Sequence, residues 1–156
     1  EHAIDFLEYA VDQMEERYKK FSNKNVNDIY QYNKIPSQEK IPWWMIILEE
    51  YADLAADIKN RTKLESLMGK LSAKARAAGI HLIVITQKPI VKIINNVVKA
   101  NLPTRLAFKV TSNVDSRIIL DEGGAELLND KGDGIFKSTS TDRFQCALVH
   151  DPERES

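Results

Sequence analysis

The stretch Ile46-Ile47-Leu48-Glu49-Glu50-Tyr51-Ala52-Asp53-Leu54 decides the fold, because an apolar run ends there in two adjacent carboxylates. A strand buried in a parallel sheet is continuously hydrophobic rather than alternating. Ligands of such sheets bind beyond the carboxyl ends of the strands, where Glu49 and Glu50 would lie. One carboxylate can hold Mg²⁺ on nucleotide phosphates while its neighbour orients or deprotonates an attacking water. A strand that simply runs into a solvated acidic turn would give the same short pattern.

The composition describes one globular domain of 156 residues with a formal net charge of −1, in which 43% of residues are hydrophobic and 29% are charged. A basic surface for nucleic acid would therefore have to be local, or be completed when subunits assemble. No apolar stretch approaches a membrane span, and no signal peptide is visible. The single Cys146 lies in an apolar segment, which excludes an internal disulfide, fits a reducing compartment and favours core packing. The three histidines, His2, His81 and His150, lack metal-ligand spacing.

Helix and strand patterns alternate along the chain. The spacing of apolar residues predicts helices over 7–21, 62–78, 89–98 and 112–121, and strands over 43–48, 80–85, 105–110, 135–137 and 144–149. Gly79 is expected to release the second helix into a left-handed turn, and Pro89 to open the third. Ser112, with Asp115 three residues later, resembles a capping box at the start of the fourth. This alternation predicts an α/β fold with an open, mainly parallel sheet flanked by helices.

Several motifs occur in the order found in one family of motor proteins. They are Met-Glu-Glu-Arg-Tyr at 14–18, Val-Asn-Asp-Ile at 26–29, Tyr-Asn at 32–33, the acidic strand end, Lys-Ala-Arg-Ala-Ala-Gly-Ile-His at 74–81, Thr-Gln-Lys-Pro at 86–89, Lys-Ala-Asn-Leu-Pro-Thr-Arg at 99–105, Asp-Ser-Arg-Ile-Ile-Leu-Asp at 115–121, Gly-Gly-Ala-Glu at 123–126 and Gly-Asp-Gly at 132–134. Through these motifs, which cover nearly the whole chain, the sequence resembles the FtsK/SpoIIIE DNA translocases. The resemblance implies a partial RecA-like P-loop NTPase fold, belonging to the motor of a ring-forming, ATP-driven pump for double-stranded DNA.

The phosphate-binding loop of that family has no counterpart in the sequence, because no Gly-x-x-x-x-Gly-Lys-Ser/Thr run occurs in it. The family places this loop upstream of the first helix. The resemblance therefore implies that residues 1–156 are a single domain, the C-terminal portion of an FtsK-type motor domain lacking the upstream Walker A segment, and that this portion alone is inactive. ATP and Mg²⁺ are the implied cofactors. The implied partners are double-stranded DNA, bound without sequence preference, and further copies of the chain in a homo-oligomeric ring, a hexamer. The motor part is expected in the cytoplasm, reaching a membrane only through segments outside this chain.

The resemblance assigns roles to residues that follow the first two predicted strands. Glu50 matches the family's catalytic glutamate. Glu49 stands where the family usually has Asp, so its role as a Mg²⁺ ligand is an open question, because Mg²⁺ tolerates distorted geometry poorly. Gln87, preceded by Thr86, is expected near the γ-phosphate or the attacking water, where RecA-like folds sense the nucleotide state. Capping of the next helix is the alternative interpretation, and Thr86 is the better candidate for that cap.

Three further sites come from the same resemblance. Arg105 is implied to be the arginine supplied in trans to a neighbouring subunit's ATP, where a guanidinium neutralises charge on the transferred phosphoryl group. A surface ion pair is the alternative. Ser116 and Arg117 lie in an implied pore loop on the DNA backbone, and the segment from Lys137 to Arg143 is a second loop whose Ser, Thr and Arg side chains can donate to phosphate. A merely solvated charge is the alternative for each of these residues.

Two other functions stay open at this stage. The first is another motor of the same superfamily, such as a conjugation coupling protein or a secretion ATPase, which would move a different cargo with the same engine. The second is a non-catalytic interaction module that has kept the fold and lost hydrolysis. The missing phosphate-binding loop and the Glu at position 49 motivate this second alternative.

Overall fold

The computed structural model describes residues 2–147, whose contacts divide the chain into two compact units. The first unit comprises residues 2–88 and 95–101, and the second comprises residues 89–94 and 102–147. Each unit has its own elements and its own buried side chains. The assignment of the chain to a single portion of a motor domain stays a prediction. None of the helices within residues 2–147 is both long enough and apolar enough to cross a membrane.

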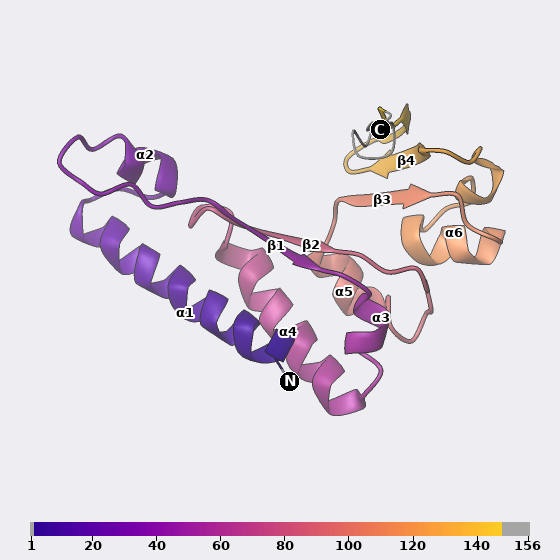
Figure 1. Ribbon diagram of the computed structural model, residues 1–156, viewed down its shortest axis with the longest axis horizontal. Helices are drawn as coiled ribbons and strands as arrows, with labels where there is room; N and C mark the ends of the chain where they lie inside the picture. Colours follow the sequence, from indigo (N-terminus) through magenta and orange to yellow (C-terminus); the bar gives the residue numbers. More distant parts are fainter. Residues whose placement is uncertain (1, 148–156) are drawn as a thin grey trace, which may run out of the picture. The chain divides into compact units, whose positions relative to one another are not determined.

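The first unit is a parallel pair of strands covered by helices. Its elements are α1 (His2–Asn23), α2 (Ile29–Asn33), β1 (Trp44–Leu48), α3 (Tyr51–Leu54), α4 (Ile58–Lys74), β2 (Ile80–Val84) and α5 (Asn96–Asn101). The two strands run in parallel, with Trp44 opposite Ile80 and Leu48 opposite Val84. The long helices α1 and α4 pack on each other and lie along one face of the strand pair (Figure 1).

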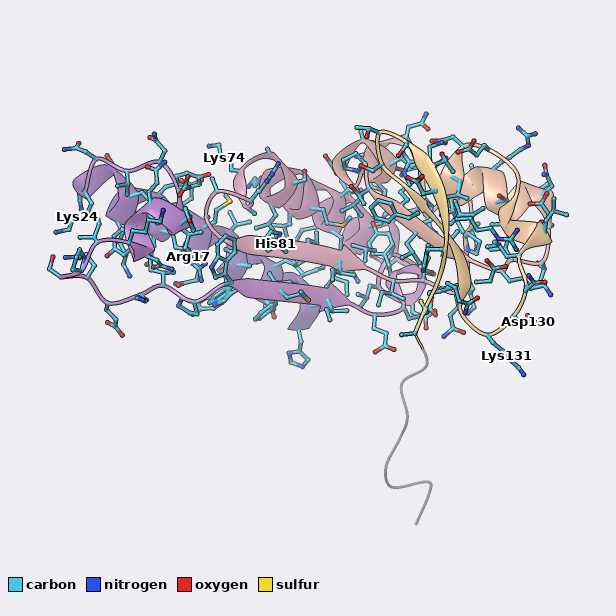
Figure 2. The ribbon with its side chains drawn as sticks, turned by 90° about the horizontal axis from the view of Figure 1, so that it is seen from above. Arg17, Lys24, Lys74, His81, Asp130 and Lys131 are labelled. Atoms are coloured by element: carbon cyan, nitrogen blue, oxygen red, sulfur yellow. The ribbon has the colours of Figure 1, made fainter. Side chains whose placement is uncertain are left out.

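The amphipathic first helix predicted from the sequence is confirmed as α1, and its inner face carries a buried arginine. Arg17 is 4% exposed, its Nη1 donates to the carbonyl of Ala78 at 2.7 Å, and its guanidinium lies 4.7 Å from the Trp44 ring centroid (Figure 2). Burial lowers the pKa of Arg17, because desolvation disfavours the charged form. The next residue, Tyr18, donates its hydroxyl to the carbonyl of Lys74 at 2.7 Å. The motifs at 14–18 and 74–81 therefore meet, and α1 anchors the turn that leads into β2.

Gly79 ends that turn in the left-handed conformation predicted from the sequence, with φ +73. A Cβ at this position would lie 2.4 Å from Cδ1 of Ile29, so the packing also requires a residue without a side chain. The preceding helix is shifted toward the N-terminus relative to the prediction. It begins at Ile58, because the side chain of Asp57 caps it by accepting from the N–H of Asn60 at 3.0 Å.

One face of the strand pair is covered by the described residues and the other is exposed. In β1, Ile46 and Leu48 are buried, while Met45 and Ile47 are exposed. The continuous apolar runs predicted strands buried on both faces, whereas the described helices cover one face only. Figure 2 views the unit from the strand side, and the large exposed apolar side chains of this face are Trp43, Met45, Ile47, Ile83 and Ile85.

The second unit is an antiparallel sheet with a helix packed on it (Figure 1). Its elements are β3 (Arg105–Phe108), α6 (Asn113–Leu120), the 3-10 turn η1 (Ala125–Leu127), β4 (Asp133–Lys137) and β5 (Thr141–Gln145). The strand order is β3-β4-β5. The predicted cap of α6 is confirmed, since Ser112 Oγ accepts from the N–H of Asp115 at 3.1 Å. The core of the second unit consists of Ala107, Leu120, Ala125, Leu128 and Ile135.

Four local expectations are corrected by the structure. The helix expected over 89–98 is limited to α5, because the Asn95 side chain caps it by accepting from the N–H of Val97 at 2.9 Å. The last three strands pair antiparallel, so within residues 2–147 parallel pairing is confined to β1 and β2. The last predicted strand begins earlier, at Thr141, and its residues 148–149 lie outside the described part of the chain. Cys146, expected in the core, follows β5 and is exposed.

Candidate functional site

The carboxyl end of β1 contains a β-bulge that positions Glu50. Leu48 is opposite Val84, so a regular parallel ladder would continue with Ile85 bonded to Leu48 and Glu50. The N–H of Ile85 donates to the carbonyl of Leu48 at 2.9 Å, as the regular ladder requires. Its carbonyl, however, accepts from the N–H of Tyr51 at 2.8 Å and not from Glu50. Glu50 is thus the extra residue, with φ 47 and ψ 60. This left-handed conformation is uncommon outside glycine, and such strain is often found at functional sites.

The Glu50 carboxylate is bound by the two residues that follow Ile85. Thr86 Oγ1 donates to it at 2.9 Å, and the backbone N–H of Gln87 lies 3.4 Å from both carboxylate oxygens. Both donors are neutral, and no cation within residues 2–147 forms an ion pair with Glu50. The structure therefore brings Glu50, Thr86 and Gln87 together at the carboxyl ends of two parallel strands. The Gln87 side chain itself is exposed.

Glu49 is the second carboxylate of the strand end. It is exposed and makes no hydrogen bond or ion pair with the described residues. Mg²⁺ at nucleotide sites is usually held by one or two carboxylates together with phosphate oxygens and waters. The oxygen donors of Glu49 and Glu50 fit that requirement. No group of three or more metal-ligating side chains exists among residues 2–147, so an all-protein metal cage is not formed by this part of the chain.

Tyr51 fixes the bulge from the protein interior. Its side chain is 0% exposed, and its hydroxyl has no hydrogen-bond partner among the described residues. Burial, followed by the nearby Glu65 carboxylate, raises the pKa of Tyr51 to about 12, against a smaller opposing effect of Arg61. The N–H of Tyr51 is the group that closes the bulge, so burial of the ring holds the backbone of Glu50 in place.

A separate cleft of about 530 Å³ lies at the opposite, amino ends of β1 and β2. Trp43 and His81 stack there, with ring centroids 5.7 Å apart and an interplanar angle of 12°. Figure 2 labels Lys74 and His81 of its wall, and its other lining residues are Tyr18, Asp28, Ile29, Tyr30, Ala73, Arg76 and Ala77. None of the predicted site residues lines this cleft, so the candidate nucleotide site is elsewhere.

In the second unit, Arg105 opens β3 and is held by the end of α6. Its Nη1 donates to the carbonyl of Ile119 at 3.1 Å and to Asp121 Oδ2 at 2.5 Å, and its Nε donates to the carbonyl of Leu102 at 3.4 Å. The side chain is 18% exposed. The ion pair weighed as an alternative for Arg105 is therefore present. Nη2 makes no hydrogen bond with the residues that the structure describes, so half of the guanidinium fork is available for another ligand.

The two residues of the first implied DNA-facing loop differ in exposure. Ser116 is 0% exposed, and its hydroxyl donates to the carbonyl of Glu122 at 2.8 Å and accepts from the N–H of Ala125 at 3.1 Å. It joins α6 to η1, and this burial corrects the expectation that Ser116 faces DNA. Arg117 is exposed on α6, where its Nε donates to the side-chain oxygen of Asn113 at 2.8 Å.

The second implied loop is the β4–β5 hairpin. Lys137 Nζ donates to Glu122 Oε1 at 3.0 Å and to a backbone carbonyl of α6. Arg143 forms a two-point ion pair with Asp133, with N–O distances of 2.8 and 2.5 Å. The Arg143 guanidinium holds the pKa of Asp133 well below its usual range. Both cations therefore brace the hairpin, and the exposed residues 138–140 form its tip.

Sequence reasoning missed the carboxylates that bind these cations, namely Asp121, Glu122 and Asp133. Asp121 ends the predicted helix 112–121 and Glu122 directly follows it, whereas Asp133 lies in the Gly-Asp-Gly motif. The acidic residues were visible in the sequence, but no sequence signal indicated which of them would pair with a given cation. The partners of Lys137 and Arg143 lie 15 and 10 residues away, so only the folded chain pairs them.

Comparison with known proteins gives consistent results. Residues 1–91 match the FtsK/SpoIIIE family. The chain is 44% identical to DNA translocase FtsK of Clostridium acetobutylicum over 98% of its length, which is 21% of that protein. It is 42% identical to DNA translocase SftA of Bacillus subtilis over 94% of its length, which is 16% of that protein. The chain thus spans about a fifth of these relatives.

Solved structures agree with the predicted fold class. The chain superposes with a TM-score of 0.80 and 29% identity on the pCW3 conjugation coupling protein TcpA, solved with ATPγS, covering 92% of this chain and 43% of that one. The type VII secretion ATPase EccC of Thermomonospora curvata gives a TM-score of 0.79 at 21% identity, covering 96% of this chain and 18% of that one, which shows the fold alone. The α/β class and the partial P-loop ATPase fold are therefore confirmed, and the chain belongs to the FtsK/SpoIIIE family.

Proposed function

We propose that this chain is part of a ring-shaped motor that uses ATP hydrolysis to move double-stranded DNA. The main observation in support is the geometry at the carboxyl end of β1. There a bulge places the Glu50 carboxylate against Thr86 and Gln87, and no cation of the described residues is paired with it. The relatives that are 42% to 44% identical to this chain are DNA translocases, and this supports DNA as the cargo.

The proposed chemistry at the strand end follows from its contacts. Glu50 orients or deprotonates the water that attacks the γ-phosphate, since general bases must lie within hydrogen-bond reach of that water. Thr86 fixes the rotamer of Glu50 through its 2.9 Å hydrogen bond. Glu49 offers its free carboxylate to a bound Mg²⁺, which would neutralise charge on the phosphate oxygens. The exposed Gln87 side chain reports the presence of the γ-phosphate to the loop that follows β2.

Arg105 is proposed to act on the nucleotide of a neighbouring subunit. Asp121 and the backbone carbonyls hold its Nη1 and Nε, and this leaves Nη2 for phosphoryl oxygens. A guanidinium in that place stabilises charge that develops on the transferred group. The trans role requires a homo-oligomeric ring, and a hexamer is the proposed size.

Arg117 and the hairpin tip at residues 138–140 are the proposed contacts to the DNA backbone. Both are exposed, and both offer donors that bind phosphate without reading bases. Lys137 and Arg143 are each paired with a carboxylate, so they would stabilise the hairpin more than they would contact DNA directly. Anchoring of the motor to a membrane through segments outside this chain, and its place in the cytoplasm, stay predictions.

The decisive test is Glu50→Gln in the complete motor protein that contains this chain. The amide keeps the shape of the site, and its oxygen can still accept from Thr86, but it removes the base. Steady-state hydrolysis with DNA should fall by about 10²- to 10⁴-fold, while ATP binding changes little. Hydrolysis by Glu50→Gln within about threefold of the unaltered motor would overturn the assignment of Glu50.

A second candidate, a conjugation coupling protein or secretion ATPase, is favoured by the superposition on TcpA at 29% identity. Cargo separates the two functions. Hydrolysis stimulated by double-stranded DNA, together with displacement of a third strand from a triplex on linear DNA, would support the double-stranded DNA pump. Stimulation only by a protein substrate would support secretion. The non-catalytic alternative predicts no hydrolysis with either cargo.

A further inference from the structure

Two cations on neighbouring strands grip the same helix end in the second unit. Arg105 on β3 and Lys137 on β4 are register partners. Arg105 donates to the carbonyl of Ile119, and Lys137 donates to the carbonyl of the next residue of α6. Each cation also pairs with a carboxylate just beyond the helix, at 2.5 Å to Asp121 for Arg105 and at 3.0 Å to Glu122 for Lys137. We call Arg105, Lys137, Asp121 and Glu122 the α6 clamp.

The α6 clamp satisfies groups that every helix leaves without intrahelical partners. The last carbonyls of a helix need external donors, and cations near this end complement the helix dipole. Asp121 ends α6 in the left-handed conformation, with φ 62, so the chain turns away immediately. The side chains of the sheet therefore supply the hydrogen bonds that hold the helix end.

Asp121 links Arg105 to Arg117 by two direct bonds. Its carboxylate accepts from Arg105, and its backbone N–H donates to the carbonyl of Arg117 at 3.0 Å. Arg117 is the exposed arginine of α6, and its Nε is oriented by Asn113 one turn earlier. A displacement of the Arg105 guanidinium would therefore act on this end of α6 directly, at the carbonyl of Ile119, and through Asp121 on the carbonyl of Arg117.

We propose that Asp121 is a positioning residue that couples the nucleotide state of a neighbouring subunit to DNA grip. Its carboxylate holds the Arg105 guanidinium at Nη1, which leaves Nη2 without a hydrogen-bond partner among the described residues, and its N–H closes the turn that carries Arg117. Movement of Arg105 toward phosphoryl oxygens then pulls on Asp121 and shifts the end of α6. This coupling rests on the proposed function, because it takes Arg105 as the trans-acting arginine and Arg117 as the DNA contact.

Glu122 provides a matched control, because it has the same relation to Lys137 that Asp121 has to Arg105. It accepts from Lys137 and from Thr141 Oγ1 at 2.8 Å, and it has no bond to Arg105. Hydrogen bonds from these two side chains lower the pKa of Glu122. Loss of its charge should loosen the helix end as much as loss of the Asp121 charge does, but without releasing Arg105.

The experiment uses the assembled motor that contains the complete chain. The Kd for a short double-stranded DNA is measured by fluorescence anisotropy with ADP and with ATPγS, so the readout needs nucleotide binding but no turnover. Coupling between two ligands typically changes affinity by about 5- to 150-fold. In Asp121→Asn the ratio of the two Kd values should fall below about twofold, while Glu122→Gln keeps a ratio near that of the unaltered motor. Asn is well suited to the left-handed conformation at 121, so the fold should be kept.

A full Kd ratio in Asp121→Asn, or an equal loss in Glu122→Gln, would overturn the coupling role of Asp121. A ratio near one in the unaltered motor would also overturn it. The pump function is judged separately, by hydrolysis stimulated with double-stranded DNA, so its failure is distinguishable. If Asp121→Asn unfolds, Asp121→Gly in the same assay tests the same contact, because glycine readily adopts the left-handed conformation at 121 and removes the carboxylate that holds Arg105.

Discussion

The carboxylate at the end of β1 and the carboxylates at the end of α6 lie in opposite electrostatic settings. Glu50 accepts hydrogen bonds only from neutral donors, a hydroxyl and a backbone N–H. Asp121 and Glu122 each hold a cation, at 2.5 and 3.0 Å. A carboxylate without an ion pair stays available to a metal or a water, whereas a paired one fixes geometry. The carboxylate at the end of β1 is therefore open to a ligand, whereas the carboxylates at the end of α6 hold the helix end to the sheet.

Arg105→Ala in the assembled ring is expected to have the largest effect, because Arg105 is the cation that Asp121 holds. If Arg105 serves a neighbour's nucleotide, hydrolysis should fall by about 10³- to 10⁵-fold, because charge on the transferred phosphoryl group loses its partner. Binding of DNA at saturating nucleotide should change much less. Steady-state ATPase assays and anisotropy with labelled DNA measure the two effects.

Subunit mixing provides the control for Arg105. An Arg105→Ala subunit still has its own Glu50, and a Glu50→Gln subunit still has Arg105. Rings that contain both should therefore recover hydrolysis above that of either variant alone. If no mixing ratio restores activity, and ring assembly is confirmed by light scattering, the trans role of Arg105 is wrong.

A smaller effect is expected at Thr86, the neutral donor to Glu50. Thr86→Val keeps the volume but removes the 2.9 Å hydrogen bond, so the carboxylate loses its fixed orientation. A hydrogen bond of this kind contributes about 0.5–1.5 kcal/mol, which predicts a fall in kcat of up to about tenfold.

Thr86→Ser is the matched control for that change. It keeps the hydroxyl and should retain kcat within about twofold of the unaltered motor. If Thr86→Val and Thr86→Ser give the same kcat, the orientation of Glu50 does not depend on this contact.

DNA affinity should separate Arg117 from Arg143, two arginines with very different partners. Arg117→Ala removes an exposed donor, so affinity should fall about fivefold on every DNA sequence, and the slope of log K against log salt should flatten by about 0.9. Affinity titrations at three salt concentrations on two unrelated sequences test this.

Arg143→Ala should act on stability instead. It removes the partner that lowers the pKa of Asp133, a carboxylate that is 5% exposed. A carboxyl with a lowered folded pKa stabilises the fold above its unfolded value and loses that contribution as pH falls through the folded value. The unaltered protein should therefore lose stability on acidification below about pH 4 more steeply than Arg143→Ala does. Equal acid profiles of Tm would contradict this role.

Local patterns predicted much of this molecule, because they depend on neighbouring residues. The apolar run before Glu49, the left-handed Gly79 and the Ser112 cap are all properties of a few consecutive positions. The antiparallel pairing of β3, β4 and β5 was missed, since hydrophobic periodicity does not specify strand direction. Burial of Ser116 was also missed, because its partner Ala125 lies nine residues away across a turn.

The candidate site shows the same division between local and long-range information. The adjacent carboxylates were visible in the sequence, and family resemblance assigned Gln87 and Arg105. The bulge at Glu50 depends on Ile85, which skips one N–H of the neighbouring strand, and no pattern of residue types encodes that shift. The Asp121 and Glu122 contacts depend equally on the register between β3 and β4. Contacts between residues far apart in the sequence therefore determine the features of the site that local sequence patterns did not predict.

The smallest expected effect concerns the buried residue behind the bulge. Tyr51→Phe removes a hydroxyl that has no partner among the described residues, so the free energy of unfolding should stay equal or rise by up to about 1 kcal/mol near pH 8. The phenol pKa of about 12 in the folded state exceeds the unfolded value of about 10, so the unaltered protein binds one more proton when folded between these limits. Its stability should therefore fall as pH rises from about 10 to about 12, while Tyr51→Phe lacks this contribution. Urea unfolding of both proteins at pH 8 and pH 11 tests the difference, which should widen at the higher pH. Because Phe keeps the ring that holds the backbone of Glu50, hydrolysis should be unchanged; a loss of hydrolysis with unaltered stability would show that the Tyr51 hydroxyl has a role in the site that its burial does not reveal.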